Sequence, residues 1–328
     1  METLLMASAG ILFGLPGLVW GADRFVAGSA STAKNFGISR LVIGLTIVSL
    51  GTSAPEIVIA INAALNGAGD MAVGNAIGSN LANIGLVLGL TVLISPAPVQ
   101  QDLLKQEGAA LLVVTILAGY LIADGDVTRP EGFLLALMLP LLLAIMLRYK
   151  RMSPETGPLT PVDTSTPEMP TVAALTKLFV GLAALLVSAE LVVWGAKNMA
   201  VYFGTSQLII GLTIVAIGTS LPELAASAIS ALRGHHEMAL GNIFGSNLLN
   251  LLAVMSIPGI ISPLSLGSEV FYRDYLAMCT ITLLLLGAIA LTLWLPRHRG
   301  GAPTLACPVG VVLLLMYTLY MATLMASP

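Results

Sequence analysis

The chain alternates between long apolar runs and short polar interruptions. Six runs of 20 or more residues carry no charge, at 3–22, 71–101, 198–222, 238–268, 275–296 and 300–328. A helix needs roughly 20 apolar residues to cross the hydrocarbon layer of a bilayer. With shorter runs at 108–123 and 132–147 included, the pattern predicts ten spanning helices, near 4–31, 38–65, 72–96, 107–124, 131–149, 173–202, 205–232, 239–263, 274–295 and 304–325.

Composition and charge also indicate a protein that lies in the lipid bilayer. Hydrophobic residues make up 57% of the 328 residues and charged residues 9%, and the mean hydropathy is +0.95. Soluble domains carry about 25% charged residues, so we predict an all-α integral membrane protein surrounded by the lipid bilayer. The net charge of −3 provides no basic surface for nucleic acid, and we expect no nucleic-acid partner.

A polar segment divides the chain into two parts. Residues 152–170 read "MSPETGPLTPVDTSTPEMP", a composition rich in proline, serine and threonine that cannot build a core and predicts a flexible linker. The parts 1–151 and 171–328 each hold five predicted helices. If the N-terminus lies outside, only Arg129, Lys197 and Arg273 of the 14 Lys and Arg residues fall outside. This bias predicts a cytoplasmic linker and a multi-pass protein of the plasma (inner) membrane.

The two parts are copies of one another. Shifted by 167 residues, they align without a gap from Asp23 to Asn83, and 11 of 15 positions are identical between 42–56 and 209–223. An odd number of helices per copy forces the second copy to enter the membrane upside down. Inverted repeats are typical of transporters, whose substrate site lies near the midplane where the repeats meet. Asp23 and its match Glu190 are expected near helix ends or in hydrated crevices.

A proline followed by a glutamate stands inside both matched runs, "GLTIVSLGTSAPE" at 44–56 and "GLTIVAIGTSLPE" at 211–223. Pro55 has no N–H, and its ring crowds the carbonyl group of Gly51. Backbone oxygens at 49–51 are therefore expected to be partly released from helical hydrogen bonds, which lipid tolerates only where they are buried in protein or line a site. Thr52 and Glu56 are four residues apart and share a helix face.

The two glutamates carry the most chemistry, because a carboxylate in the middle of a spanning helix is rare and functional by default. Glu56 and Glu223 are matched, and no Lys or Arg lies near either in sequence. The next helix of each half adds a hydroxyl and an amide four residues apart, Ser79 with Asn83 and Ser246 with Asn250. Such oxygen donors suit Ca²⁺ or Na⁺ rather than zinc. A kinked packing motif with protonated glutamates is the alternative.

The motifs "GTSAPE" with "GNAIGSNLAN" and "GTSLPE" with "GNIFGSNLLN", within 44–83 and 211–250, resemble the paired alpha-repeats of the sodium/calcium exchangers, in the cation/calcium antiporter superfamily. The resemblance implies four ion sites at the membrane centre, one used by Ca²⁺ and the others mainly by Na⁺. The implied ligands are the carboxylates of Glu56 and Glu223, hydroxyl or carbonyl oxygens of Thr52, Ser53, Ser79, Thr219, Ser220 and Ser246, carbonyls of Ser49 and Ala216, and amides of Asn83 and Asn250. Some members of the family have Asp at the position of Asn250. With Asn there, the cluster keeps two carboxylates, Glu56 and Glu223, which are enough to neutralise one Ca²⁺.

The expected function is therefore exchange of Ca²⁺ for Na⁺ by alternating access, in a single chain that needs no cofactor and is not an enzyme. A proton-coupled antiporter for Ca²⁺ or another divalent cation is the alternative within this class. Two other classes are weaker: a cation channel, and an intramembrane aspartyl protease suggested by "GAGD" at 67–70, whose Asp70 lies in a predicted turn. His235, His236 and Glu237 are interpreted as a solvated turn.

Overall fold

The computed structural model describes residues 2–152, 169–204, 214, 216–295 and 302–326, and these ranges are almost entirely helical. Several helices contain π-helical segments, labelled η. The first half contains, in order, α1 (Glu2–Phe36), α2 (Arg40–Ile43), η1 (Gly44–Val48), α3 (Ser49–Thr52), α4 (Ala54–Leu65), α5 (Gly69–Ala82), η2 (Asn83–Leu88), α6 (Gly89–Ile94), β1 (Ala97–Pro98), η3 (Leu103–Gly108), α7 (Ala109–Ile122), β2 (Asp126–Val127) and α8 (Arg129–Met152). The second half contains α9 (Thr171–Tyr202), α11 (Ala216–Thr219), α12 (Leu221–Leu232), α13 (His236–Leu249), η5 (Asn250–Val254), α14 (Ser256–Ile261), β3 (Leu264–Ser265), η6 (Val270–Tyr275), α15 (Leu276–Trp294), β4 (Thr304–Leu305) and α16 (Cys307–Ala326).

The spanning helices agree with the predicted set. Within the described ranges, eight helices are long and apolar enough to cross a membrane, and a ninth span is the pair Arg40–Thr52 and Ala54–Leu65, bent by 45°. The remaining predicted helix, 205–232, lies partly outside the described residues; its described part includes α11 and α12. The first helix continues past its predicted end at 31 to Phe36: Ser31, Thr32 and Ala33 are buried, and the last three residues of the helix are exposed.

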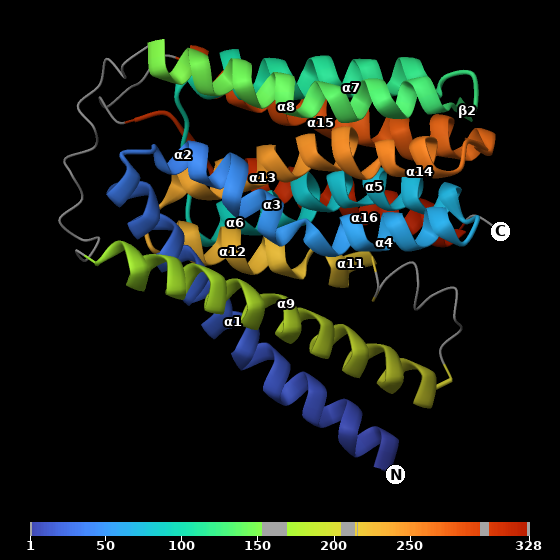
Figure 1. Cartoon of the computed structure of the whole chain (residues 1–328), viewed down its shortest axis with the longest axis horizontal. Helices are drawn as coiled ribbons and strands as arrows, with labels where there is room; N and C mark the ends of the chain where they lie inside the picture. Colours follow the sequence, from blue (N-terminus) through green and yellow to red (C-terminus); the bar gives the residue numbers. More distant parts are fainter. Residues whose placement is uncertain (1, 153–168, 205–213, 215, 296–301, 327–328) are drawn as a thin grey trace.

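The two halves run in opposite directions. In Figure 1 the segment from α5 to α6 runs from right to left, whereas its counterpart from α13 to α14 runs from left to right. The element bounds repeat with the shift found in the sequence: α4 corresponds to α12, α5 to α13, and η3 to η6. The duplication is thus built as two inverted repeats, as predicted.

Helices α1 and α9 form an antiparallel pair that crosses one side of the body (Figure 1). The pair is close because glycines face backbone across it. A Cβ on Gly28 would lie 2.3 Å from the nitrogen of Leu178, and one on Gly181 would lie 2.3 Å from the nitrogen of Phe25. Small residues allow membrane helices to approach closely, where packing replaces the hydrophobic effect as the source of stability.

Asp23 lies well inside α1 rather than at its end, with a side chain 40% exposed. The Arg233 guanidinium, just after α12, donates to Asp23 Oδ1 from Nε at 2.8 Å and also from Nη2. This ion pair joins α1 to α12, against which α1 also packs. Glu190, the match of Asp23, lies exposed in α9.

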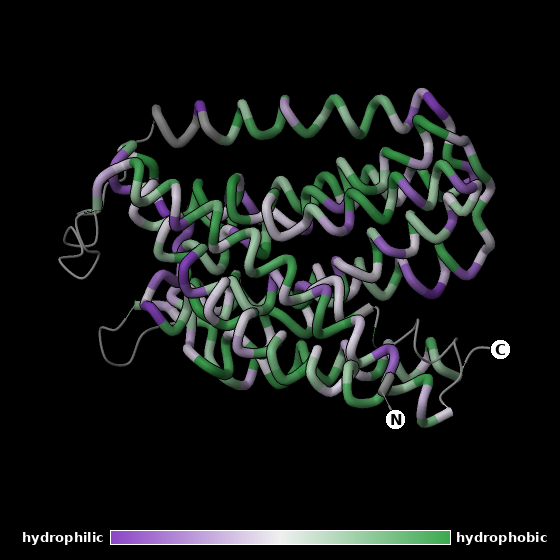
Figure 2. Tube along the Cα trace, turned by 60° about the horizontal axis from the view of Figure 1, so that its bottom comes forward, coloured by the Kyte–Doolittle hydropathy of each residue, from purple (hydrophilic) through white to green (hydrophobic). Residues whose placement is uncertain are grey.

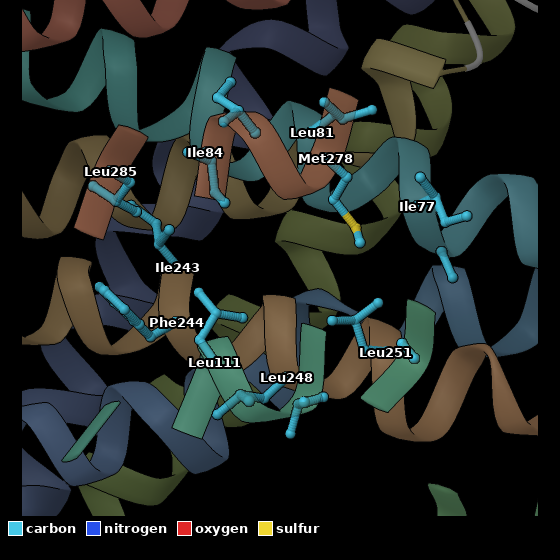
Figure 3. Packing of buried hydrophobic residues seen from close by; sticks show 14 of the residues in the cluster. Ile77, Leu81, Ile84, Leu111, Ile243, Phe244, Leu248, Leu251, Met278 and Leu285 are labelled. Atoms are coloured by element: carbon cyan, nitrogen blue, oxygen red, sulfur yellow. The ribbon is translucent and has the colours of Figure 1, made fainter. Parts of the chain in front are cut away.

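The main core lies between four spans. Figure 3 shows its side chains converging from α5 and η2, α7, α13 and η5, and α15, among them Ile77, Leu111, Phe244 and Leu285. Figure 2 shows hydrophobic residues along the outer helices as well, with hydrophilic residues gathered mostly near the turns. An outer surface of this kind suits contact with lipid.

Two short antiparallel sheets connect the halves at their loops. Strand β1 pairs with β4, with Ala97 opposite Leu305, and β2 pairs with β3, with Asp126 opposite Ser265. Each sheet therefore contains one strand from each repeat.

Candidate cation-binding site

Each of the two matched helices that contain the proline–glutamate pair is interrupted at a serine, two residues before the proline. Ser53 (φ −84°, ψ 8°) separates α3 from α4, and Ser220 (φ −89°, ψ 4°) separates α11 from α12. Each proline then occupies the first turn of the new helix, where a missing N–H costs nothing. One expectation needs correction: the Ser49 carbonyl oxygen is not released, because it accepts a hydrogen bond from the nitrogen of Ser53 at 2.9 Å. A carbonyl oxygen has a second lone pair, which leaves room for a cation.

The predicted polar residues are buried in the interior of the body. Ten of them expose at most 3% of their surface: Ser49, Thr52, Ser53, Glu56, Ser79, Asn83, Ser220, Glu223, Ser246 and Asn250. Thr219 is partly buried, and Ala216 is the first residue of α11. The buried members come from the broken helices and from α5, η2, α13 and η5, so both repeats contribute.

Direct contacts join the two repeats at this position. Ser53 Oγ lies 3.0 Å from Glu223 Oε1 and 3.1 Å from Ser246 Oγ. Glu56 lies in the first turn of α4, directly after Ser53, and is buried as Glu223 is. The structure therefore brings the matched glutamates, which are 167 residues apart in the chain, into one polar cluster.

Several oxygens of this cluster are buried without a hydrogen-bond partner in the described part of the chain: Glu56 Oε2, Glu223 Oε2, Ser220 Oγ, Asn83 Oδ1 and Asn250 Oδ1. A buried polar atom left unsatisfied costs about 1–3 kcal/mol. Hard cations such as Ca²⁺ and Na⁺ are bound by carboxylate, amide, hydroxyl and carbonyl oxygens. The donor set therefore fits such cations, and a bound cation would compensate these groups.

A family model described as sodium/calcium exchanger protein matches residues 6–148 and 174–326. The chain belongs to the sodium/calcium exchanger family. It is 46% identical over 285 residues to the putative antiporter CaxA of Alkalimonas amylolytica, covering 86% of this chain and 89% of CaxA. It is 35% identical to the inner membrane protein YrbG of Escherichia coli, covering 91% and 92%. A solved structure of the sodium-calcium exchanger NCX_Mj matches with a TM-score of 0.82 and 31% identity, covering 98% of this chain and 99% of NCX_Mj.

The exchanger is thus a multi-pass membrane antiporter of this family and not an enzyme, as predicted. The protease interpretation depended on Asp70, which is an exposed residue in the first turn of α5. The interpretation of residues 235–237 as a solvated turn is wrong: His235 is buried, and His236 and Glu237 are partly buried in the first turn of α13.

Sequence reasoning missed several buried polar residues of the exchanger, three within the repeated motifs and two beyond them. They are Asn80, Asn242 and Asn247 on α5 and α13, and Glu107 and Asp274 in η3 and η6. Glu107 and Asp274 are separated by the same 167 residues as the glutamates, a signal that lay beyond the end of the alignment at Asn83. Asp274 is paired with Arg273, whose Nε lies 2.7 Å from Asp274 Oδ1, and accepts from the hydroxyl of Tyr320 at 3.1 Å.

Asn242 is the missed residue nearest to the cluster. Its Nδ2 donates to Ser227 Oγ at 2.9 Å and lies 3.5 Å from the backbone oxygen of Glu223, while its Oδ1 lies 3.2 Å from Thr52 Oγ1. It was overlooked because the resemblance assigned ligand roles only to the later residues of "GNIFGSNLLN".

Proposed function

We propose that this exchanger moves Ca²⁺ in one direction and Na⁺ in the other across the plasma membrane, with the buried cluster as the shared site. The observation that supports this most strongly is the pairing of Glu56 and Glu223, one from each inverted repeat, among buried hydroxyl and amide groups. Two carboxylates balance the charge of one Ca²⁺. Na⁺ needs several oxygens to replace its water shell, and the surrounding Ser, Thr and Asn side chains supply them.

Exchange then follows from competition for one set of oxygens. Either one Ca²⁺ or several Na⁺ neutralise the glutamates, whereas an empty cluster holds two uncompensated charges, which are costly in an apolar environment. The α1–α9 pair is the element proposed to move, because it packs on one side of the body and carries none of the candidate ligands. Movement of this pair would open the cluster to one side of the membrane or the other.

We also propose an orientation of the chain in the membrane and an oligomeric state. The Lys and Arg distribution favours an outside N-terminus and a cytoplasmic segment at 152–170. One chain supplies both glutamates, so we propose that a monomer is the functional unit and that no cofactor is required.

Purified protein in proteoliposomes tests the function. An outward Na⁺ gradient is expected to drive ⁴⁵Ca²⁺ uptake, and a K⁺ or pH gradient alone is expected to drive little. Uptake that follows the pH gradient and is indifferent to Na⁺ would place the exchanger among proton-coupled antiporters. Flux that no counter-ion on the opposite side stimulates would indicate a channel.

A further inference from the structure

The side chain of Asn242 is fully buried between the two halves of the cluster, where it contacts both broken helices. Its partners are Thr52 on α3, and Ser227 with the backbone of Glu223 on α12. The family resemblance implies no ligand role for Asn242.

The orientation of the amide follows from its partners. The backbone oxygen of Glu223 can only accept hydrogen bonds, so the NH₂ group must face it. The same NH₂ group donates to Ser227 Oγ at 2.9 Å. The amide oxygen, Oδ1, must then face Thr52, and because an amide oxygen can only accept, the Thr52 hydroxyl is the donor.

The Thr52 hydroxyl has one proton and other possible acceptors. Its oxygen lies 3.2 Å from Asn242 Oδ1, 3.3 Å from the carbonyl oxygen of Ser49, and near the carboxylate of Glu223. A proton given to Ser49 or to Glu223 would occupy an oxygen that the proposed function needs for a cation. A proton given to Asn242 leaves those oxygens, and the lone pairs of Thr52 itself, available.

We infer that Asn242 is a positioning residue for cation binding: it accepts the proton of Thr52 and thereby turns the lone pairs of that hydroxyl toward the ions. The inference rests on the proposed function and adds a residue that touches no ion. Asn75, the match of Asn242, is only partly buried and its Nδ2 has no hydrogen-bond partner within the described residues, so its amide is anchored less firmly than that of Asn242 and we expect a weaker role for it.

The test is a double-mutant cycle in proteoliposomes, with the Na⁺ concentration for half-maximal ⁴⁵Ca²⁺ exchange as the readout. Asn242→Leu, close to isosteric, should raise this concentration about fivefold, as expected for one lost hydrogen bond. Thr52→Val should raise it at least as much. The double variant should be no worse than Thr52→Val alone, because a positioning residue has no effect once its target is gone. Asn75→Leu is the matched control and should have the smaller effect.

Additive effects of the two substitutions, or an equal effect of Asn75→Leu, would overturn the inference. If Asn242→Leu does not fold, Asn242→Ala replaces it, because it also removes the oxygen that accepts from Thr52; Thr52→Val should then cost less in this background than in the wild type. An equal cost there would also overturn the inference. Wild-type protein without Na⁺-dependent exchange would refute the proposed function and the inference together, whereas Na⁺-dependent exchange with an additive cycle would refute the inference alone.

Discussion

At the scale of single residues, the candidate site consists of side chains that lie far apart in the chain and touch only in the folded protein. Glu56 and Glu223 stood out because a matched pair of glutamates in apolar helices is hard to explain by packing alone. The contacts of Ser53 with Glu223 and Ser246, and of Thr52 with Asn242, join positions 170 to 193 residues apart. No local pattern specifies such contacts, because they depend on how the two repeats interlock.

Neutralising either glutamate should stop exchange. Glu56→Gln or Glu223→Gln keeps the size of the side chain and removes half of the charge that faces a cation, a loss of about 3 kcal/mol or more for a buried partner, or on the order of 100-fold in affinity. The measurement is ⁴⁵Ca²⁺ exchange in proteoliposomes, with the elution profile in detergent as a control for folding. Near-normal exchange by either variant would remove that glutamate from the site.

At the scale of elements, apolar runs predicted where helices lie, but not where they change form. The breaks at Ser53 and Ser220 could be anticipated from the proline two positions later in each half. The π-helical segments that begin at Asn83 and Asn250 could not, because a widened turn depends on how neighbouring helices pack around it. The α1–α9 contact could not be predicted from the sequence either, because the spacing of glycines in one helix does not identify the helix that packs against it.

The α1–α9 contact should be sensitive to a single methyl group. Gly181→Ala places a Cβ 2.3 Å from the backbone nitrogen of Phe25, so the helices must separate, and the temperature of thermal unfolding should fall. Gly287→Ala on α15 is the control, because a Cβ there meets no atom within 4 Å and alanine is the better helix former. Differential scanning fluorimetry of both variants in the same detergent makes the comparison. Equal unfolding temperatures for the two variants would mean that α1 and α9 are less tightly packed than described.

At the scale of the whole molecule, the duplication and the odd number of helices predicted an inverted architecture, and the opposite course of matched spans agrees with it (Figure 1). The sidedness of that architecture in the membrane stays a prediction. It depends on the Lys and Arg residues in the loops.

Matched loop positions test the sidedness. Gln101, just after β1, and Ser268, just after β3, are exposed and separated by 167 residues. With Cys279 and Cys307 replaced by serine, Ser268→Cys should react with an impermeant maleimide added to intact cells, whereas Gln101→Cys should react only after the membrane is opened. Labelling of both from the same side would contradict inverted insertion, and labelling in the reverse order would place the N-terminus inside.

The two small sheets have a consequence for how many polypeptides the fold requires. Because β1 with β4 and β2 with β3 each combine the two repeats, and the core in Figure 3 contains side chains from both, the two halves are joined by contacts between their own described residues. A covalent connection then serves mainly to raise the local concentration of one half near the other. Two genes encoding 1–152 and 169–328 should therefore yield fragments that copurify and exchange Ca²⁺ when produced together, and neither fragment should do so alone. Such a pair would resemble the state in which two oppositely inserted subunits form one transporter.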